Sequence, residues 1–137
     1  MDDDGWFDTG DLARRLPGGG IRLSGRVKDL VIRGGENIPV VEVEAALLGH
    51  PGVREVAVVG VPDDRLGERA CAVVVPADPD APPDLDALVR HLADVGMARL
   101  FWPESLVIRA ELPRTTTGKI RKFRLRADLG SPAASVR

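Results

Sequence analysis

Apolar residues recur at helical spacing in two stretches of the chain. In Val40 to Leu47 they repeat every three or four residues, with Glu42 and Glu44 on the other side, and glycine and proline residues follow. Leu85 to Val95 repeats the pattern at positions i, i+3, i+4 and i+7. The segment from Phe123 to Leu129 is a further candidate for a short helix. The pattern predicts two amphipathic helices and a short C-terminal one.

Apolar runs without helical spacing predict strands. Val53 to Val61 and Glu68 to Val75 are rich in valine and are joined by a Pro-Asp-Asp turn, so we expect them to pair antiparallel. Ser105 to Ile108 predicts a further short strand. Strands and helices alternate along the chain, which indicates an α+β fold with a central three-stranded sheet flanked by helices.

The N-terminal region predicts a separate two-stranded hairpin. Residues Ile21 to Gly25 alternate apolar and polar side chains after a glycine-rich turn, and Asp29 to Ile32 is their expected partner. The next segment, Arg33 to Asn37, is expected to be a loop because of its two glycines.

Composition indicates one soluble globular domain. The chain has 137 residues, of which 44% are apolar, enough for a core without disulfides or metals. The formal net charge of −2 gives no overall attraction to nucleic acid or acidic membranes. Cys71 is the only cysteine, which excludes a disulfide framework and favours a reducing compartment such as the cytoplasm; its apolar neighbours favour a buried, inert thiol. No apolar run approaches the roughly 20 residues of a membrane span.

The segment LPRTTTGKIRK, Leu112 to Lys122, is the strongest candidate for chemistry. It differs from a phosphate-binding P-loop, because Pro113 replaces the first glycine and Ile120 replaces the hydroxyl that binds magnesium. Gly118 nevertheless allows a sharp turn, and Lys119 is a point charge suited to reaching an oxyanion.

Two other interpretations of this segment remain open. One is a solvated basic loop, which residue types alone favour. The other is a nucleic-acid patch, which the scarcity of aromatic residues and the acidic total disfavour. The basic residues concerned are Arg114, Arg121, Lys122, Arg124 and Arg126.

Three segments together resemble the C-terminal motifs of the adenylate-forming enzymes, which include acyl-CoA synthetases. They are WFDTGD (Trp6 to Asp11), GRVKDLVIRGGENI (Gly25 to Ile38) and LPRTTTGKIRK, in the family's order and spacing. The resemblance implies that a carboxylic acid is activated with Mg-ATP to an acyl-adenylate, and that coenzyme A then takes the acyl group. A small C-terminal lid domain rotates between the two steps, while a large N-terminal domain carries most of the ATP, Mg²⁺ and acyl sites.

The resemblance also implies roles for particular residues. Lys119 matches the catalytic lysine of the adenylation step. Asp11 matches the aspartate that binds the ribose hydroxyls, Arg26 matches an arginine that contacts the nucleotide, and Lys28 falls at the hinge.

The RGGEN segment matches the loop that lines the tunnel for the pantetheine arm of coenzyme A. In this segment Gly34 and Gly35 would allow close approach of the backbone, and Glu36 and Asn37 would supply polar contacts. A plain turn is the alternative for the two glycines.

Domain organisation follows from the same resemblance. We expect residues 1–24 to end a large N-terminal domain, residues 25–130 to form the lid, and residues 131–137 to be a disordered tail. The expected function is the C-terminal domain of an acyl-CoA synthetase of the fatty-acid type, inactive without its N-terminal domain; the FWPES segment (Phe101 to Ser105) is the hint for that acid. The alternatives are a stand-alone binding or regulatory module, and adenylation that loads a carrier protein.

Overall fold

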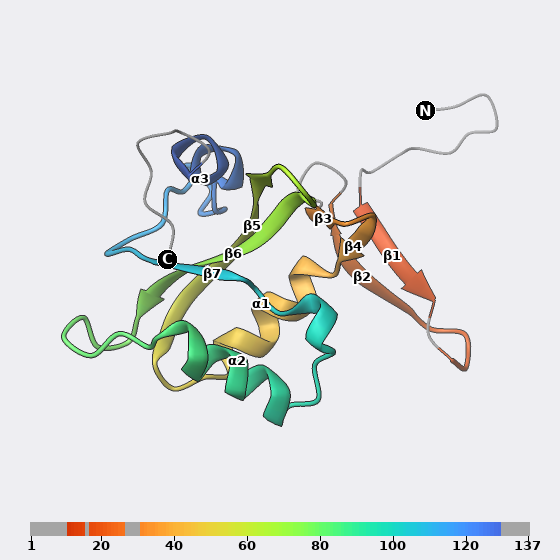
Figure 1. The fold of residues 1–137 in the computed structure, drawn as a ribbon, viewed down its shortest axis with the longest axis horizontal. Coiled ribbons are helices and arrows are strands. Elements are labelled where there is room, and N and C mark those ends of the chain that lie inside the picture. The colour runs from red at the N-terminus through yellow and green to blue at the C-terminus, as the bar shows by residue number, and fades with distance from the viewer. Residues whose placement is uncertain (1–10, 16, 27–30, 130–137) are drawn as a thin grey trace.

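The computed structural model describes residues 11–15, 17–26 and 31–129 (Figure 1). A five-stranded sheet forms its centre, with strand order β4-β3-β6-β5 and with β7 pairing in parallel with β6. The other strand pairs of this sheet are antiparallel. The strands are β3 (Val31–Arg33), β4 (Glu36–Ile38), β5 (Val53–Asp63), β6 (Gly67–Pro76) and β7 (Ser105–Ile108).

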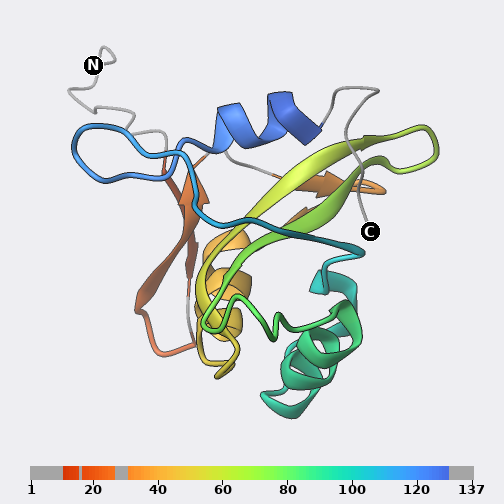
Figure 2. The same cartoon turned by 90° about the vertical axis from the view of Figure 1, so that its left-hand side faces the viewer.

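Helices cover both faces of this sheet. The helical elements are α1 (Val40–Leu48), α2 (Leu85–Asp94), the 3₁₀ turn η2 (Arg99–Phe101) and α3 (Lys122–Leu129). Figure 2 shows α3 on one face of the long β5–β6 pair, with α1 and α2 on the other. The α+β fold predicted from the sequence is confirmed, and the sheet has five strands where three were expected.

Burial on two faces explains the unbroken apolar runs of β5 and β6. Alternate side chains of one set, among them Val58 and Val74, pack with Leu47, Leu88 and Leu92 of α1 and α2. The intervening set packs with α3 and with the chain leading to it. The strand residues of that set are Ala57, Val59, Val61, Cys71, Val73 and Val75, and their partners are Leu112, Leu125 and Leu129. A strand that is buried on both faces shows no polar alternation.

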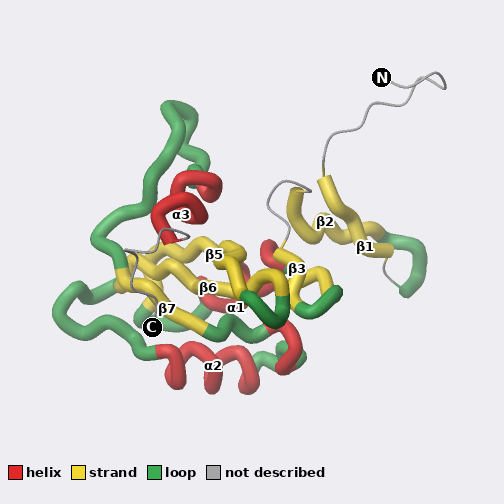
Figure 3. Tube along the Cα trace, turned by 45° about the horizontal axis from the view of Figure 1, so that its top comes forward, coloured by secondary structure: helices red, strands yellow, loops and turns green. Residues whose placement is uncertain are grey.

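The N-terminal hairpin differs from the predicted one. Strand β2 (Ile21–Arg26) pairs with β1 (Asp11–Arg15), so the partner expected at Asp29 to Ile32 was wrong. The glycine-rich turn before β2 closes this hairpin, because Gly18 and Gly19 both adopt positive φ angles. Figure 3 shows the pair as a separate unit beside the central sheet, and β2 contacts α1.

Candidate functional site

The lysine loop, which we define as residues 114–120, is a closed turn with a fixed shape. Arg114 and Ile120 form an isolated antiparallel bridge at its base. Within it, the Thr115 N–H donates to the Lys119 carbonyl at 2.8 Å and the Gly118 N–H donates to the Thr115 carbonyl at 3.0 Å. Gly118 has a φ of 91°, a conformation that suits glycine. The sequence therefore builds a tight turn just before Lys119.

Lys119 is exposed at this turn, and its ammonium group forms no ion pair with any described residue. Its backbone N–H donates to the Thr115 hydroxyl at 3.2 Å, and that hydroxyl lies 2.9 Å from the Thr117 hydroxyl. These threonines shape the loop with their hydroxyl groups. The arrangement leaves the long lysine side chain directed at solvent, where it can meet an anion carried by another domain or ligand.

Several neighbouring basic residues are engaged within the protein. Arg114 pairs with Glu55 of β5 and donates to the Gly118 carbonyl at 2.7 Å. Lys122 pairs with Glu44 of α1 at 2.8 Å. The Arg121 guanidinium lies over the Phe123 ring, 4.9 Å from its centroid. Sequence reasoning grouped all three as loop cations and missed the two glutamates, because each pair joins residues far apart in the chain.

The two glycines of RGGEN form a β-hairpin turn rather than an open loop. Arg33 pairs with Glu36 across two residues, Gly34 and Gly35, whose φ angles are 56° and 86°. Positive φ at both central positions defines the type I′ turn that hairpins favour. The turn alone therefore explains both glycines. The Glu36 and Asn37 side chains are exposed on β4.

Arg33 anchors this RGG hairpin (β3 and β4) to the segment that follows α2. Its guanidinium pairs with Glu104 at 2.8 Å and also donates to the carbonyls of Trp102, at 3.3 Å, and Leu100. On the other side, the Gly34 N–H donates to the Leu66 carbonyl in the β5–β6 turn at 2.9 Å. This arginine, which sequence reasoning left without a role, is a structural anchor.

The lysine loop and the RGG hairpin lie on different sides of the domain. In Figures 1 and 2 the loop before α3 and the β3–β4 hairpin are on opposite sides of the long β5–β6 pair. The two elements therefore belong to different surfaces of the domain.

Two further predicted residues lie in the N-terminal hairpin. Asp11 and Arg26 are direct cross-strand partners at the open end of the β1–β2 pair. Residues 1–10 and the predicted hinge residue Lys28 lie outside the described residues, as does the predicted tail at 131–137.

Comparison with known proteins decides the family. The model of the AMP-binding enzyme C-terminal domain matches residues 42–119, which includes the lysine loop up to Lys119. The chain belongs to this family. Among curated proteins, this domain is 45% identical over 129 residues to the medium-chain fatty-acid–CoA ligase of Escherichia coli, covering 94% of this chain and 23% of that protein.

A second curated relative is named for a different acid. The domain is 43% identical over 136 residues to the salicyl-AMP ligase / salicyl-S-ArCP synthetase of Mycobacterium tuberculosis, covering 99% of this chain and 24% of that one. Its fold matches ATP-bound MatB from Rhodopseudomonas palustris with a TM-score of 0.83 and 39% identity, over 96% of this chain and 26% of that structure. The chain spans about a quarter of the length of the curated relatives that it matches.

The thiol of this C-terminal domain is buried and unreactive. Cys71 lies on β6 with no exposed surface. Burial raises the pKa of the Cys71 thiol, which keeps it protonated at neutral pH. The prediction that the only cysteine is a buried thiol is confirmed.

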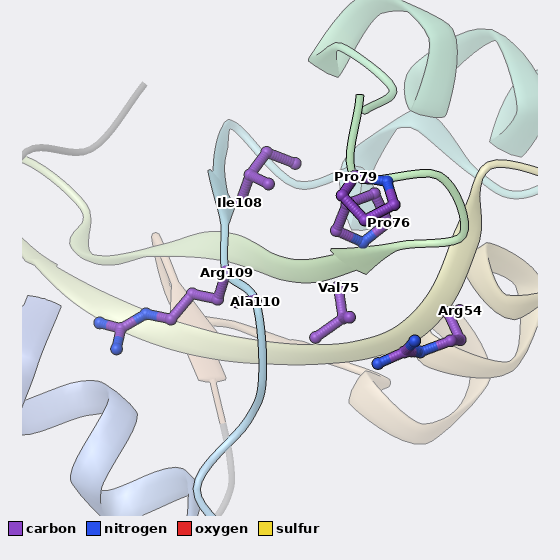
Figure 4. A pocket seen from close by; sticks show the side chains of 7 residues that line it. All are labelled: Arg54, Val75, Pro76, Pro79, Ile108, Arg109 and Ala110. Atoms are coloured by element: carbon purple, nitrogen blue, oxygen red, sulfur yellow. The ribbon is translucent and has the colours of Figure 1, made fainter. Parts of the chain in front are cut away.

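The described part of the domain offers no metal centre and no membrane-spanning helix. Residues 11–15, 17–26 and 31–129 contain no group of three or more His, Cys, Asp or Glu residues placed to hold a metal ion. They also contain no helix that is long and apolar enough to cross a bilayer. A cleft of about 240 Å³ at the ends of β6 and β7 is lined by two arginines and by apolar residues (Figure 4). None of the predicted site residues lines it.

Proposed function

We propose that this chain is the lid domain of an acyl-CoA synthetase, a ligase that activates a carboxylic acid with ATP and transfers the acyl group to coenzyme A. The observation that carries the proposal is the exposed Lys119 at the end of a preformed turn, on a different side from the RGG hairpin. Two separate functional faces suit an enzyme with two half-reactions, in which the lid turns between them.

In the first half-reaction Lys119 is the proposed catalytic residue. Its ammonium group contacts the oxygens of the acid and of the α-phosphate, where negative charge must be offset while the acyl-phosphate bond forms and pyrophosphate leaves. A unit charge about 4 Å from a lysine gains roughly 4 kcal/mol at an effective dielectric near 20. The exposure of Lys119 supports this role, since an ammonium held in a buried ion pair could not reach a substrate.

In the second half-reaction the RGG hairpin is the proposed contact with the pantetheine arm of coenzyme A. Gly34 and Gly35 present backbone without side chains, and an added Cβ at Gly35 would meet open space. Glu36 and Asn37 are exposed donors and acceptors beside them. The thiol of coenzyme A attacks the acyl carbonyl, and AMP leaves.

The remaining proposed contacts concern the nucleotide and the hinge. Asp11 suits the ribose hydroxyls because a carboxylate accepts two hydrogen bonds from a diol, and Arg26 suits ribose or phosphate oxygens. The register that makes them cross-strand partners supports a shared ligand. Lys28 is the proposed hinge. Mg²⁺ would neutralise charge on the ATP phosphates. We assign its ligands to the N-terminal domain, because the described residues contain no group of His, Cys, Asp or Glu side chains placed to hold a metal ion.

The domain boundaries remain part of this proposal. Residues 25–130 would move as the lid, residues 1–24 would belong to the N-terminal domain, and residues 131–137 would be a tail. The chain spans about a quarter of the length of its relatives. We therefore expect activity to require the N-terminal domain as well.

For the acid, a fatty acid is the first candidate, on the FWPES segment and the Escherichia coli ligase. An aryl acid loaded onto a carrier protein is the second candidate, because the name of the Mycobacterium tuberculosis relative includes salicyl-S-ArCP. An enzyme that carries this chain can be assayed for ATP–pyrophosphate exchange with octanoate and salicylate in parallel, and then with coenzyme A and carrier protein as acceptors.

A chimera tests the proposal directly. This chain replaces the matching C-terminal segment of the Escherichia coli ligase, and the chimera is assayed for ATP–pyrophosphate exchange. Lys119→Ala is expected to lower this exchange about 100-fold or more, the usual effect of removing one transition-state donor. Thioester formation from preformed acyl-adenylate should change less than about threefold.

The control for this test is Arg124→Ala, which removes an exposed cation from the neighbouring helix. It should leave both steps close to the parent chimera. An equal loss in the two steps for Lys119→Ala, or a loss as large for Arg124→Ala, would contradict the assigned role.

A further inference from the structure

Two ion pairs hold the lysine loop and the start of α3 against the edge strand β5 and helix α1. The incoming arm carries Arg114, which pairs with Glu55 of β5. The outgoing arm leads into α3, where Lys122 pairs with Glu44 of α1. Among the described strands β5 pairs only with β6, so its other edge is open to such partners.

The Lys122–Glu44 ion pair is also hydrogen-bonded to the backbone of β5. The Glu44 carboxylate oxygen that pairs with Lys122 also accepts a hydrogen bond from the Val58 N–H at 2.8 Å. The side chains of Lys122 and Glu44 are only 13% and 17% exposed. Solvent and salt therefore screen this pair less than an ordinary surface pair.

The Arg114–Glu55 ion pair lies directly beside Lys119. The guanidinium of Arg114 uses one nitrogen for Glu55 and the other for the Gly118 carbonyl. That carbonyl belongs to the peptide unit that leads into Lys119. The ion pair therefore fixes the orientation of the chain where the lysine begins.

From this geometry we propose that Glu44 and Glu55 are positioning residues for Lys119. Through Lys122 and Arg114 they hold the lysine loop in one position relative to the sheet, so that a rotation of the whole domain delivers the ammonium group to one place. This inference rests on the proposed role of Lys119 in adenylation. Neither glutamate contacts the substrate; each acts through the cation that it holds.

The first test needs no activity and uses this chain itself. Amide hydrogen exchange is measured residue by residue for Glu44→Gln, Glu55→Gln and the double variant. We expect the amides of Thr115, Gly118 and Lys119 to exchange about tenfold faster, while amides of β6 change less than twofold. Glutamine keeps the size of the side chain and, at position 44, an acceptor for the Val58 N–H.

A matched control and a rescue separate this effect from a general loss of stability. Glu111→Gln changes the same group at an exposed position that has no ion pair with a described residue, and it should leave the loop unchanged. Lys122→Met should reproduce the effect of Glu44→Gln, and Lys122→Arg should restore slow exchange. Unchanged exchange in the loop, equal acceleration by Glu111→Gln, or uniform acceleration throughout the domain would each overturn the proposal.

The second test asks whether the two ion pairs affect the rate of adenylation, and it uses the chimera described above. Glu44→Gln and Glu55→Gln should each lower kcat of ATP–pyrophosphate exchange about tenfold, because a misplaced group loses rate while binding persists. The KM for ATP and the rate of thioester formation should stay within twofold. Equal losses in both half-reactions, or faster loop exchange with no loss of adenylation, would overturn the positioning role.

The two proposals can fail separately. If Lys119→Ala leaves adenylation intact, the proposed function fails, whatever the exchange data show. If Lys119→Ala abolishes adenylation and the glutamate variants do not, only the positioning inference fails.

Discussion

The lysine loop and the RGG hairpin are both tight turns built on glycine, but they are held in different ways. The RGG hairpin lies within the central sheet, where backbone hydrogen bonds and the Arg33 anchor fix it. The lysine loop lies outside the sheet. It has an isolated bridge and hydrogen bonds within its own turn, and ion pairs of Arg114 and of the adjacent Lys122 hold it to β5 and α1. The hairpin should therefore be as stable as the domain, whereas the loop should respond to single changes of charge.

The two arginines that anchor these elements illustrate the difference. The Arg33 side chain is 13% exposed and makes three polar contacts, whereas the Arg114 side chain is 41% exposed and makes two. Exposed pairs contribute little to global stability, typically under about 1 kcal/mol. Arg33 should therefore matter for folding, and Arg114 for the position of its loop.

The largest effect on stability is expected for Arg33→Met. The change removes the ion pair with Glu104 and leaves the carbonyls of Leu100 and Trp102 without their donor. We expect the free energy of unfolding to fall by about 2 kcal/mol, the range for hydrogen bonds to a charged group. Urea denaturation followed by circular dichroism measures it.

Two arginine variants serve as controls for Arg33→Met. Arg65→Met alters an exposed arginine in the β5–β6 turn and should change the free energy of unfolding by less than about 0.5 kcal/mol. Arg114→Met should cost less than about 1 kcal/mol. If Arg114→Met destabilises the domain as much as Arg33→Met does, the contrast between the two elements is wrong.

A smaller effect is expected from alanine at the glycines of the two turns. Gly35 and Gly118 have φ angles of 86° and 91°, and an added Cβ would meet no atom within 4 Å of either. Strain in the backbone, roughly 1–2 kcal/mol, is therefore the main cost at both positions. In Gly35→Ala this strain should lower the free energy of unfolding of the whole domain, because the hairpin is paired within the sheet and cannot shift without breaking its hydrogen bonds.

Gly118→Ala should instead act locally. The loop can shift without unfolding the sheet, so we expect faster amide exchange in the loop and little change in the urea midpoint. Gly35→Asn is the matched control for the hairpin, since asparagine tolerates positive φ better than alanine and should cost less. Equal costs for Gly35→Ala and Gly35→Asn would show that backbone strain is not the cause.

The sequence predicts most of the fold because α1, α2 and the β5–β6 pair have strong periodic or continuous apolar patterns. The predicted strand at Asp29 to Ile32 overlaps β3, but its predicted partner was wrong, because β3 pairs with β4 and β6. The sequence does not predict β4, since it has three residues and begins with the polar pair Glu36 and Asn37. The Gly-Gly dipeptide was the available signal, because it favours a type I′ hairpin. The weak five-residue alternation of β2 likewise led to the wrong partner, because the strand β1 was not predicted.

The candidate site also has one part that the local sequence predicts and one part that it does not. The turn at Gly118 and the exposure of Lys119 follow from local sequence. The ties to Glu44 and Glu55 depend on tertiary structure, and Arg114 lies 59 residues after Glu55. Glu44 has the appearance of a solvent-facing residue in the helical pattern, yet the fold brings the open edge of β5 beside it.

The smallest effect is expected at Asp63, the last residue of β5, beside the β5–β6 turn that supports the RGG hairpin. The N–H groups of Leu66 and Arg65 and the nearby Arg69 lower the pKa of the Asp63 carboxyl in the folded domain, with the Leu66 N–H as the largest cause. A carboxyl whose pKa is lowered by folding stabilises the domain above its unfolded pKa, and this contribution disappears as the pH falls below about 4. Asp63→Asn keeps an acceptor oxygen for the turn but removes the charge. We therefore expect the loss of stability between about pH 5 and pH 2 to be shallower in Asp63→Asn than in the wild type, by urea denaturation. Asp64→Asn, at the exposed neighbouring carboxylate, should keep the wild-type slope, and a slope unchanged by Asp63→Asn would show that the turn gains nothing from the charge.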